Sequence, residues 1–211
     1  MSRRARSILV FVLGGALLSG CTGEEAPSAK PPETPPVRVV LPGKPGESAR
    51  VTDSDQVRAP DGSTYSVIDI TFVQMMIVHH AQAVEMAGLA AEHAGSPTLR
   101  KLAERISAAQ RPEMDWLRAW LKARGQAESD PAHDHDAMPG MQSAADMTAL
   151  AAARGADFDR RFVTMMIDHH RGALRMAGDV ATGGSDEKLR ETANEMSIEQ
   201  ASEIHRLEQL S

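Results

Sequence analysis

Apolar residues recur every three or four positions in four long stretches of this chain, which is the spacing that lines one face of a helix. Gly95, Ser96 and Pro97 separate the first two stretches, because glycine ends helices and a serine followed by proline begins them. The pattern predicts long helices over residues 66–94, 97–123, 156–181 and 186–210, and a shorter one over residues 143–153.

The first and third long helices share one sequence. The stretch DITFVQMMIVHHAQAVEMAG, which begins at Asp69, returns as DRRFVTMMIDHHRGALRMAG from Asp159, so that each residue lies 90 positions after its partner. The same offset relates the helices that follow, where Glu113 returns as Glu203. The duplicated unit is therefore a helical hairpin. Two hairpins with one apolar face each predict an all-α four-helix bundle over residues 65–211.

The segment before the bundle reads as an export signal and a tether. Three arginines precede an apolar run over residues 8–18, and the run ends in Leu-Ser-Gly-Cys at Cys21. This ending resembles the lipobox of bacterial lipoproteins, which predicts a lipidated Cys21; an ordinary signal peptide is the alternative. Residues 22–64 are rich in proline, which predicts a disordered tether. Within it, residues 37–41 show a weak pattern of a short strand. We therefore expect a lipid anchor to the cell membrane on its extracytoplasmic face.

Composition narrows the choice of fold and partner. Aromatic residues are only 3% of the chain, so the core must consist of Ala, Leu, Ile, Val and Met, which favours close-packed helices over sheets. The formal net charge of −6 argues against a nucleic-acid partner. The one cysteine excludes a disulfide within the chain. No residue pattern identifies a protein partner.

The repeated helices bring imidazole and sulfur to the inner face of the bundle, near the middle of each helix. Thioether and imidazole together suit copper, as Cu(I), Cu(II) or both, whereas zinc sites more often recruit cysteine. Buried imidazoles need either a metal or hydrogen bonds, and methionine is more often a core residue than a ligand. The candidate metal residues are His79, His80, His169, His170, Met75, Met76, Met86, Met165, Met166, Met176, Glu113 and Glu203.

The roles of several polar residues stay open at this point. Glu113 and Glu203 could bind a metal, orient a histidine or simply pair with it. We expect Gln110 and Gln200 to form structural hydrogen bonds. Asp69 and Asp159 suit helix starts, and His93 and His205 have no histidine at the repeat position, which favours incidental roles.

The connection over residues 126–155 holds a second, looser candidate for metal capture. Histidine and methionine gather there within nine residues, a composition that is typical of metal-binding tracts. Its members are His133, His135, Met138 and Met141.

The doubled Phe-Val-x-Met-Met-Ile-x-His-His motif and the turn from Met138 to Met141 resemble the bacterial "domain of unknown function 305" family. The resemblance covers residues 66–210. It implies a ferritin-like four-helix bundle that is secreted or membrane-anchored, and its copper-binding members imply a copper-binding role for the paired histidines and the nearby methionines.

Three functions follow as hypotheses. The first is copper binding or sequestration outside the cytoplasm, in copper homeostasis or resistance, without catalysis. The second is a metal-free surface lipoprotein whose polar core sets the helix register. The third, a ferritin-like dinuclear oxidoreductase, is less favoured, because such sites use Glu-x-x-His pairs and no glutamate lies three residues before any histidine here.

Overall fold

The computed structural model describes residues 38–41, 48, 50–53, 64–131 and 133–210. The chain divides into two units, Met1–Pro35 and Pro36–Ser211, and every described residue belongs to the second. The predicted signal peptide over residues 1–21, with its lipidation site Cys21, lies outside the described residues, as does most of the predicted tether.

Within the predicted tether, the described residues form a short β-hairpin. Strand β1 (Arg38–Leu41) pairs antiparallel with β2 (Arg50–Asp53), with Val40 opposite Val51. The strand expected over residues 37–41 is confirmed. The second strand was not predicted, because four residues with a charged residue at each end carry no alternating pattern.

The predicted helices are confirmed, with small changes at their ends. Serine or aspartate caps the N-terminus of four of them, where its side chain accepts a hydrogen bond from a free backbone N–H. The third long helix extends two residues beyond the expected end, because Gly183 keeps helical geometry. The helices are α1 (Val67–His93), α2 (Pro97–Ala123), α3 (Ala144–Ala152), α4 (Gly155–Gly183) and α5 (Glu187–Glu208), with a 3₁₀ turn, η2 (His135–Ala137).

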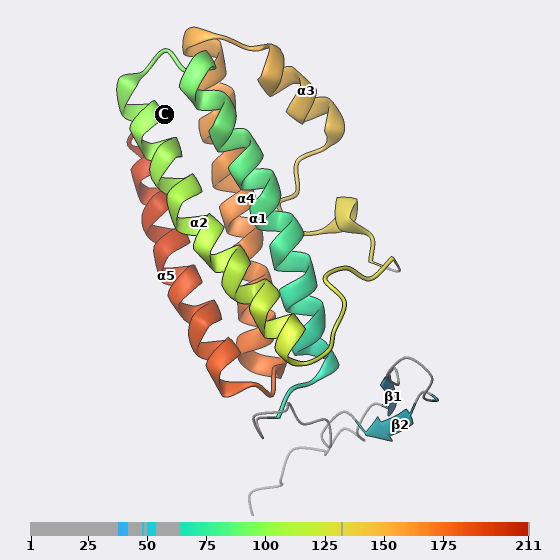
Figure 1. Cartoon of the computed structure of the whole chain (residues 1–211). Coiled ribbons are helices and arrows are strands. Elements are labelled where there is room, and N and C mark those ends of the chain that lie inside the picture. The colour runs from blue at the N-terminus through green and yellow to red at the C-terminus, as the bar shows by residue number, and fades with distance from the viewer. Residues whose placement is uncertain (1–37, 42–47, 49, 54–63, 132, 211) are drawn as a thin grey trace, which may run out of the picture. The chain divides into compact units, whose positions relative to one another are not determined.

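The two hairpins pack through their first helices. Helix α1 contacts both α2 and α4, and α4 contacts α5 (Figure 1). Gly155, at the start of α4, forms a bridge with Ala94 at the end of α1, so α1 and α4 are antiparallel. Consequently α2 and α4 run in the same direction, and the connection between them returns along the length of the bundle. One long crossover of this kind is typical of ferritin-like bundles.

A carboxylate from each repeat caps the second helix of the other repeat. Asp69 accepts hydrogen bonds from the backbone N–H groups of Ser185 at 2.9 Å and Asp186 at 3.3 Å. Asp159 accepts from the N–H groups of Gly95 at 3.0 Å and Ser96 at 2.9 Å. These contacts obey the 90-residue offset, so the two halves are related by an approximate two-fold axis. Both aspartates were predicted to lie at helix starts, and the structure shows that each also caps the start of a helix in the other repeat.

The apolar core consists of two clusters with a polar layer between them. The lower cluster joins the start of α1 to the end of α4 and includes Phe72 and Val180; the upper cluster joins the end of α1 to the start of α4 and includes Ala90 and Phe158. Polar residues near the middle of all four long helices separate the clusters. This polar layer consists of His79, His80, Gln110, Glu113, His169, His170, Gln200 and Glu203.

Helix α1 is also long and apolar enough to cross a membrane, judged by length and composition among the described residues. Half of this apolar stretch is buried. It packs against α2 and α4 and carries two of the buried histidines, as expected of the core helix of a bundle.

Candidate metal centre

The paired histidines predicted to face the core do so. His79 and His80 come from α1 and His169 and His170 from α4, and all four side chains are fully buried. They meet at one level because α1 and α4 are antiparallel and each pair lies near the middle of its helix. The helices therefore concentrate four imidazoles in one layer, where water cannot solvate them.

The outer histidine of each pair is held by a glutamate from its own hairpin. His80 Nε2 lies 2.8 Å from Glu113 Oε2, and His170 Nε2 lies 2.7 Å from Glu203 Oε2. A carboxylate accepts, so each ring donates from Nε2, and in the neutral ring Nδ1 then carries the lone pair. Of the roles left open for the two glutamates, the structure places both as histidine partners. Such a carboxylate orients an imidazole that binds a metal through its other nitrogen.

The inner histidines stack on each other. The ring centroids of His79 and His169 lie 3.7 Å apart, with an angle of 32° between the planes. His79 Nε2 also donates to the carbonyl oxygen of Pro139 at 3.1 Å, which leaves its Nδ1 with a lone pair.

Burial keeps the inner histidines neutral. The pKa of His79 falls from 6.5 to about 3, first because of burial and then because of the neighbouring His80, against the opposing effect of the hydrogen bond to Pro139. The pKa of His169 lies well below 6.5, first because of burial and then because of His79. Both rings are therefore uncharged near pH 7, the form that a metal requires.

Five imidazole nitrogens in the layer have no hydrogen-bond partner within the described structure. They are Nδ1 of His79, His80 and His170, and both ring nitrogens of His169. Unpaired buried polar atoms are costly. One nitrogen of the neutral His169 ring carries a proton, and the unpartnered nitrogens that carry a lone pair are what a cation would satisfy. Among the described residues, no group of three or more His, Cys, Asp or Glu side chains is arranged to hold a metal ion.

The predicted methionines lie in the two apolar clusters, on either side of the layer. The lower cluster contains Met76 and Met176, with Met75 packed against it; the upper cluster contains Met166 and Met86, with Met165 packed against it. Each cluster thus combines the paired methionines of one repeat with the later methionine of the other.

A turn of the crossover connection reaches the layer from the side. Gly140 has a φ of +79°, and a Cβ there would lie 2.8 Å from the backbone oxygen of His169. A Cβ on Gly172 of α4 would lie 1.9 Å from the oxygen of Pro139. Two glycines thus allow the backbones to touch and Pro139 to reach His79. Sequence reasoning missed Pro139, although the unmatched glycine in the second repeat was a signal.

The looser set of residues in the connection is divided by the fold. Met138 is buried in the lower cluster and Met141 packs against it. The rings of His133 and His135 form an edge-to-face pair with centroids 6.2 Å apart. These two histidines are near each other, whereas the methionines belong to the core.

Other polar residues differ from the sequence-based expectation. Both amide atoms of Gln110, and Oε1 of Gln200, lack hydrogen-bond partners within the described structure, so the expected structural hydrogen bonds are not formed there. His93 contacts Arg154 through Nδ1 at 3.1 Å, and His205 lies 2.9 Å from Gln209, both away from the layer.

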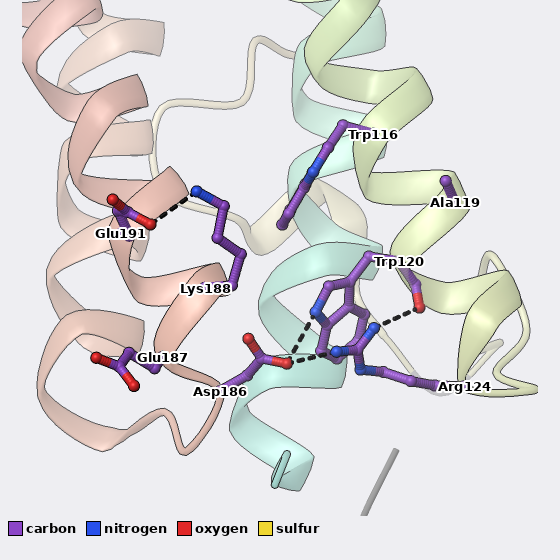
Figure 2. A pocket seen from close by; sticks show the side chains of 8 residues that line it. All are labelled: Trp116, Ala119, Trp120, Arg124, Asp186, Glu187, Lys188 and Glu191. Carbon is purple, nitrogen blue, oxygen red and sulfur yellow. Dashed lines mark hydrogen bonds and ion pairs between the residues drawn. The ribbon is translucent and has the colours of Figure 1, made fainter. Parts of the chain in front are cut away.

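A separate cavity of about 740 Å³ lies between α2 and α5 (Figure 2). Asp186 accepts from Trp120 Nε1 at 3.2 Å and from Arg124 at 2.6 Å, and the guanidinium of Arg124 lies 4.0 Å from the centroid of the Trp120 ring. These groups satisfy one another and fasten the end of α2 to the start of α5. The constellation is accounted for by packing.

Comparison with known proteins places this geometry in a family. The family model "Domain of unknown function (DUF305)" matches residues 69–211. No curated protein matches the chain. A DUF305 protein from Streptomyces coelicolor, inferred to be secreted, is 30% identical with a TM-score of 0.62, covering 66% of this chain and 88% of that one. A DUF305 fragment from Deinococcus radiodurans is 31% identical with a TM-score of 0.65, covering 69% and 96%.

A third similar structure is that of CopM in its Cu(I)-bound form. It is 30% identical with a TM-score of 0.56, and the match covers 67% of this chain and 93% of CopM. CopM has also been solved in Cu(II)-bound and Ag-bound forms. From its fold, its repeat and the family model that spans most of its described residues, the chain belongs to the DUF305 family.

Proposed function

We propose that this protein binds copper in its buried histidine layer, as Cu(I), Cu(II) or both, and sequesters it outside the cytoplasm. The observation that carries the proposal is the set of unpartnered nitrogens on four buried imidazoles. At two of these imidazoles the ring is neutral because burial depresses its pKa. A buried layer of this composition is unfavourable without a cation and favourable with one.

The glutamates and methionines take different parts in the proposed site. Glu113 and Glu203 hold His80 and His170 so that Nδ1 is free for the metal. The thioethers of Met76, Met86, Met166 and Met176, and of the less buried Met75 and Met165, flank the layer and supply soft ligands that favour Cu(I). His133 and His135, on the connection, would be a weaker capture site.

Similar proteins support the metal and the location. CopM, which is similar over two thirds of this chain, has been solved with Cu(I), Cu(II) and Ag. A second relative is inferred to be secreted. We propose export by residues 1–21 and anchoring through lipidated Cys21, with residues 22–64 as the tether. Incorporation of labelled fatty acid, lost in the Cys21→Ser variant, tests the anchor separately from the metal.

The test of copper binding compares three forms of the chain after anaerobic Cu(I) titration and, separately, Cu(II) titration. The test variant replaces the four paired histidines by asparagine, which keeps polarity in the layer. The matched control replaces His93 and His205, which lie away from the layer. We expect bound copper in the wild type and the control and its loss in the test variant, with folding checked by circular dichroism.

Equal copper content in all three forms would refute the interior site and direct attention to His133 and His135. No copper in any form, with a melting temperature that copper leaves unchanged, would favour the metal-free bundle, since a ligand that binds only the folded state must stabilise it. The dinuclear oxidoreductase gains no specific support, because its motif also needs a glutamate three residues before the histidine on two helices, and no histidine of this chain has one.

A further inference from the structure

The two halves of the bundle differ at their ends, although the repeat makes them nearly equivalent. At the lower end, a groove of about 230 Å³ opens between the start of α1 and the end of α4. Its walls include Val67, Ile68 and Phe72, and its lining also includes Met75, Met176 and Pro139. Ile68 is 46% exposed there.

At the upper end, a helix covers the equivalent place. The repeat partner of Ile68 is Phe158, which is fully buried. Leu150 of α3 and the adjacent Ala153 pack into the cluster that holds Phe158 and Met86. Helix α3 contacts both α1 and α4, and Figure 1 shows it beside them at the end of the bundle where α1 finishes and α4 begins. Helix α3 therefore covers one end of the duplicated structure, whereas the described residues leave a groove at the other end.

The open groove leads toward the histidine layer. Pro139 forms part of its wall, and the carbonyl oxygen of the same residue contacts His79. Met75 is partly buried against the lower cluster, and Met176, in the cluster, is 6% exposed. Asp179 also lines the groove, where its repeat partner is the uncharged Leu89. The mouth therefore combines two thioethers, a carboxylate and a short path to an imidazole.

We propose that this groove is the entrance by which a soft monovalent cation reaches the histidine layer, with the thioethers of Met75 and Met176 binding it first. Thioethers prefer soft cations, and a carboxylate at the mouth raises the local concentration of any cation. The inference rests on the proposed interior site for the destination of the ion, and adds to it a direction of entry and a distinct first binding site.

The internal repeat provides a matched control. Met165 and Met86 are the repeat partners of Met75 and Met176, and they lie at the end that α3 covers. Replacing either pair by leucine removes two sulfurs and keeps the side-chain volume nearly constant. A difference between the two double variants thus reports the position of the sulfurs relative to the entrance rather than a general effect of losing methionine.

The experiment uses the full chain and Ag(I), which needs no reductant. Stopped-flow mixing follows the imidazole layer through ultraviolet absorbance, and methyl NMR of ¹³C-labelled methionine follows each sulfur during titration. We expect the M75L/M176L variant to load its imidazoles about tenfold more slowly than the wild type. M86L/M165L, which lacks two of the proposed interior ligands, should bind less Ag(I) in total but keep the early shift of the Met75 and Met176 methyl signals. In the wild type, the Met75 and Met176 methyl signals should shift at the lowest Ag(I) ratios.

Wild-type loading in M75L/M176L, or loss of the early Met75 and Met176 methyl shift in M86L/M165L, would overturn the inference. If imidazoles respond to Ag(I) without an earlier shift of the two methyl groups, the entrance is refuted and the interior site stands. If those methyl groups shift and the imidazoles never respond, the thioether site stands and the interior site fails.

Discussion

The imidazole rings of His79 and His169 stack with their centroids 3.7 Å apart, and neither side chain is exposed to solvent. Each ring carries a depressed pKa, because a charge on either would be buried and would face the other. The stack is therefore an arrangement of two neutral bases, and its stability depends on pH.

The metal-free protein should lose stability as the pH falls below 6.5. Between 6.5 and about 3, the unfolded chain protonates His79 while the folded chain does not, so acid favours unfolding. For His79 alone the loss at pH 5 is about 2 kcal/mol relative to pH 7. Urea unfolding at the two pH values measures it. The His79→Asn variant should show a smaller loss, and the exposed His205→Ala control the same loss as the wild type; equal losses in all three would contradict the assignment.

The two histidine–glutamate pairs should differ in strength. The Glu203 side chain is 4% exposed and the Glu113 side chain 20% exposed, so water screens the second pair more. Replacing Glu203 by glutamine removes a charged acceptor from the more buried pair and should lower the free energy of unfolding by about 1–3 kcal/mol. Glu113→Gln should lower it less. Chemical unfolding of the two variants at pH 7 compares them. A larger loss in Glu113→Gln would mean that burial does not decide the strength of these pairs.

The carboxylates that join the two repeats should also differ. Asp69 is fully buried and accepts from Ser66 as well as from Ser185 and Asp186, whereas Asp159 is only partly buried. We expect Asp69→Asn to destabilise the bundle by about 1–3 kcal/mol and Asp159→Asn to cost less, because an amide oxygen accepts more weakly than a carboxylate. Thermal unfolding of both variants tests which substitution costs more stability. Copper binding equal to that of the wild type would check that the histidine layer is intact in both.

The position of the histidines could be predicted from sequence because two constraints agree. Helical periodicity places His79 and His169 on the inner faces, and the 90-residue offset places them at the same level of two copies of one hairpin. The same offset relates Glu113 to Glu203 and predicts equivalent contacts for both, but their pairing with the second histidine was one of the roles that the sequence left open. Neither argument needs the path of the connection.

The contacts that depend on that path could not be predicted. Pro139 contacts His79, and α3 covers only one end of the bundle, because the connection crosses over instead of turning back. Helical periodicity does not predict which of these two paths the connection takes. The contact of Asp69 with Ser185 was also missed, because it requires the antiparallel order of α1 and α4. Local patterns specify helices and their faces, whereas these contacts come from the connection and the packing of distant segments.

The contact between the connection and the histidine layer leads to the last prediction. A methyl group on Gly172 would lie 1.9 Å from the Pro139 oxygen, so Gly172→Ala must push the turn away and break its hydrogen bond to His79. We expect a loss of about 1–3 kcal/mol in urea unfolding from this overpacking. The His79 side-chain NMR signal should also shift, because its Nε2 proton loses its acceptor.

Gly178 provides the matched control, since it lies in the same helix and a methyl group there would meet nothing within 4 Å. Alanine should stabilise the protein at this position by about 0.5–1 kcal/mol, because it restricts the unfolded chain and favours helix. Opposite signs for the two glycine variants are therefore required. If Gly172→Ala is as harmless as Gly178→Ala and leaves the His79 signal in place, the turn does not hold His79, and the connection has no structural role at the layer.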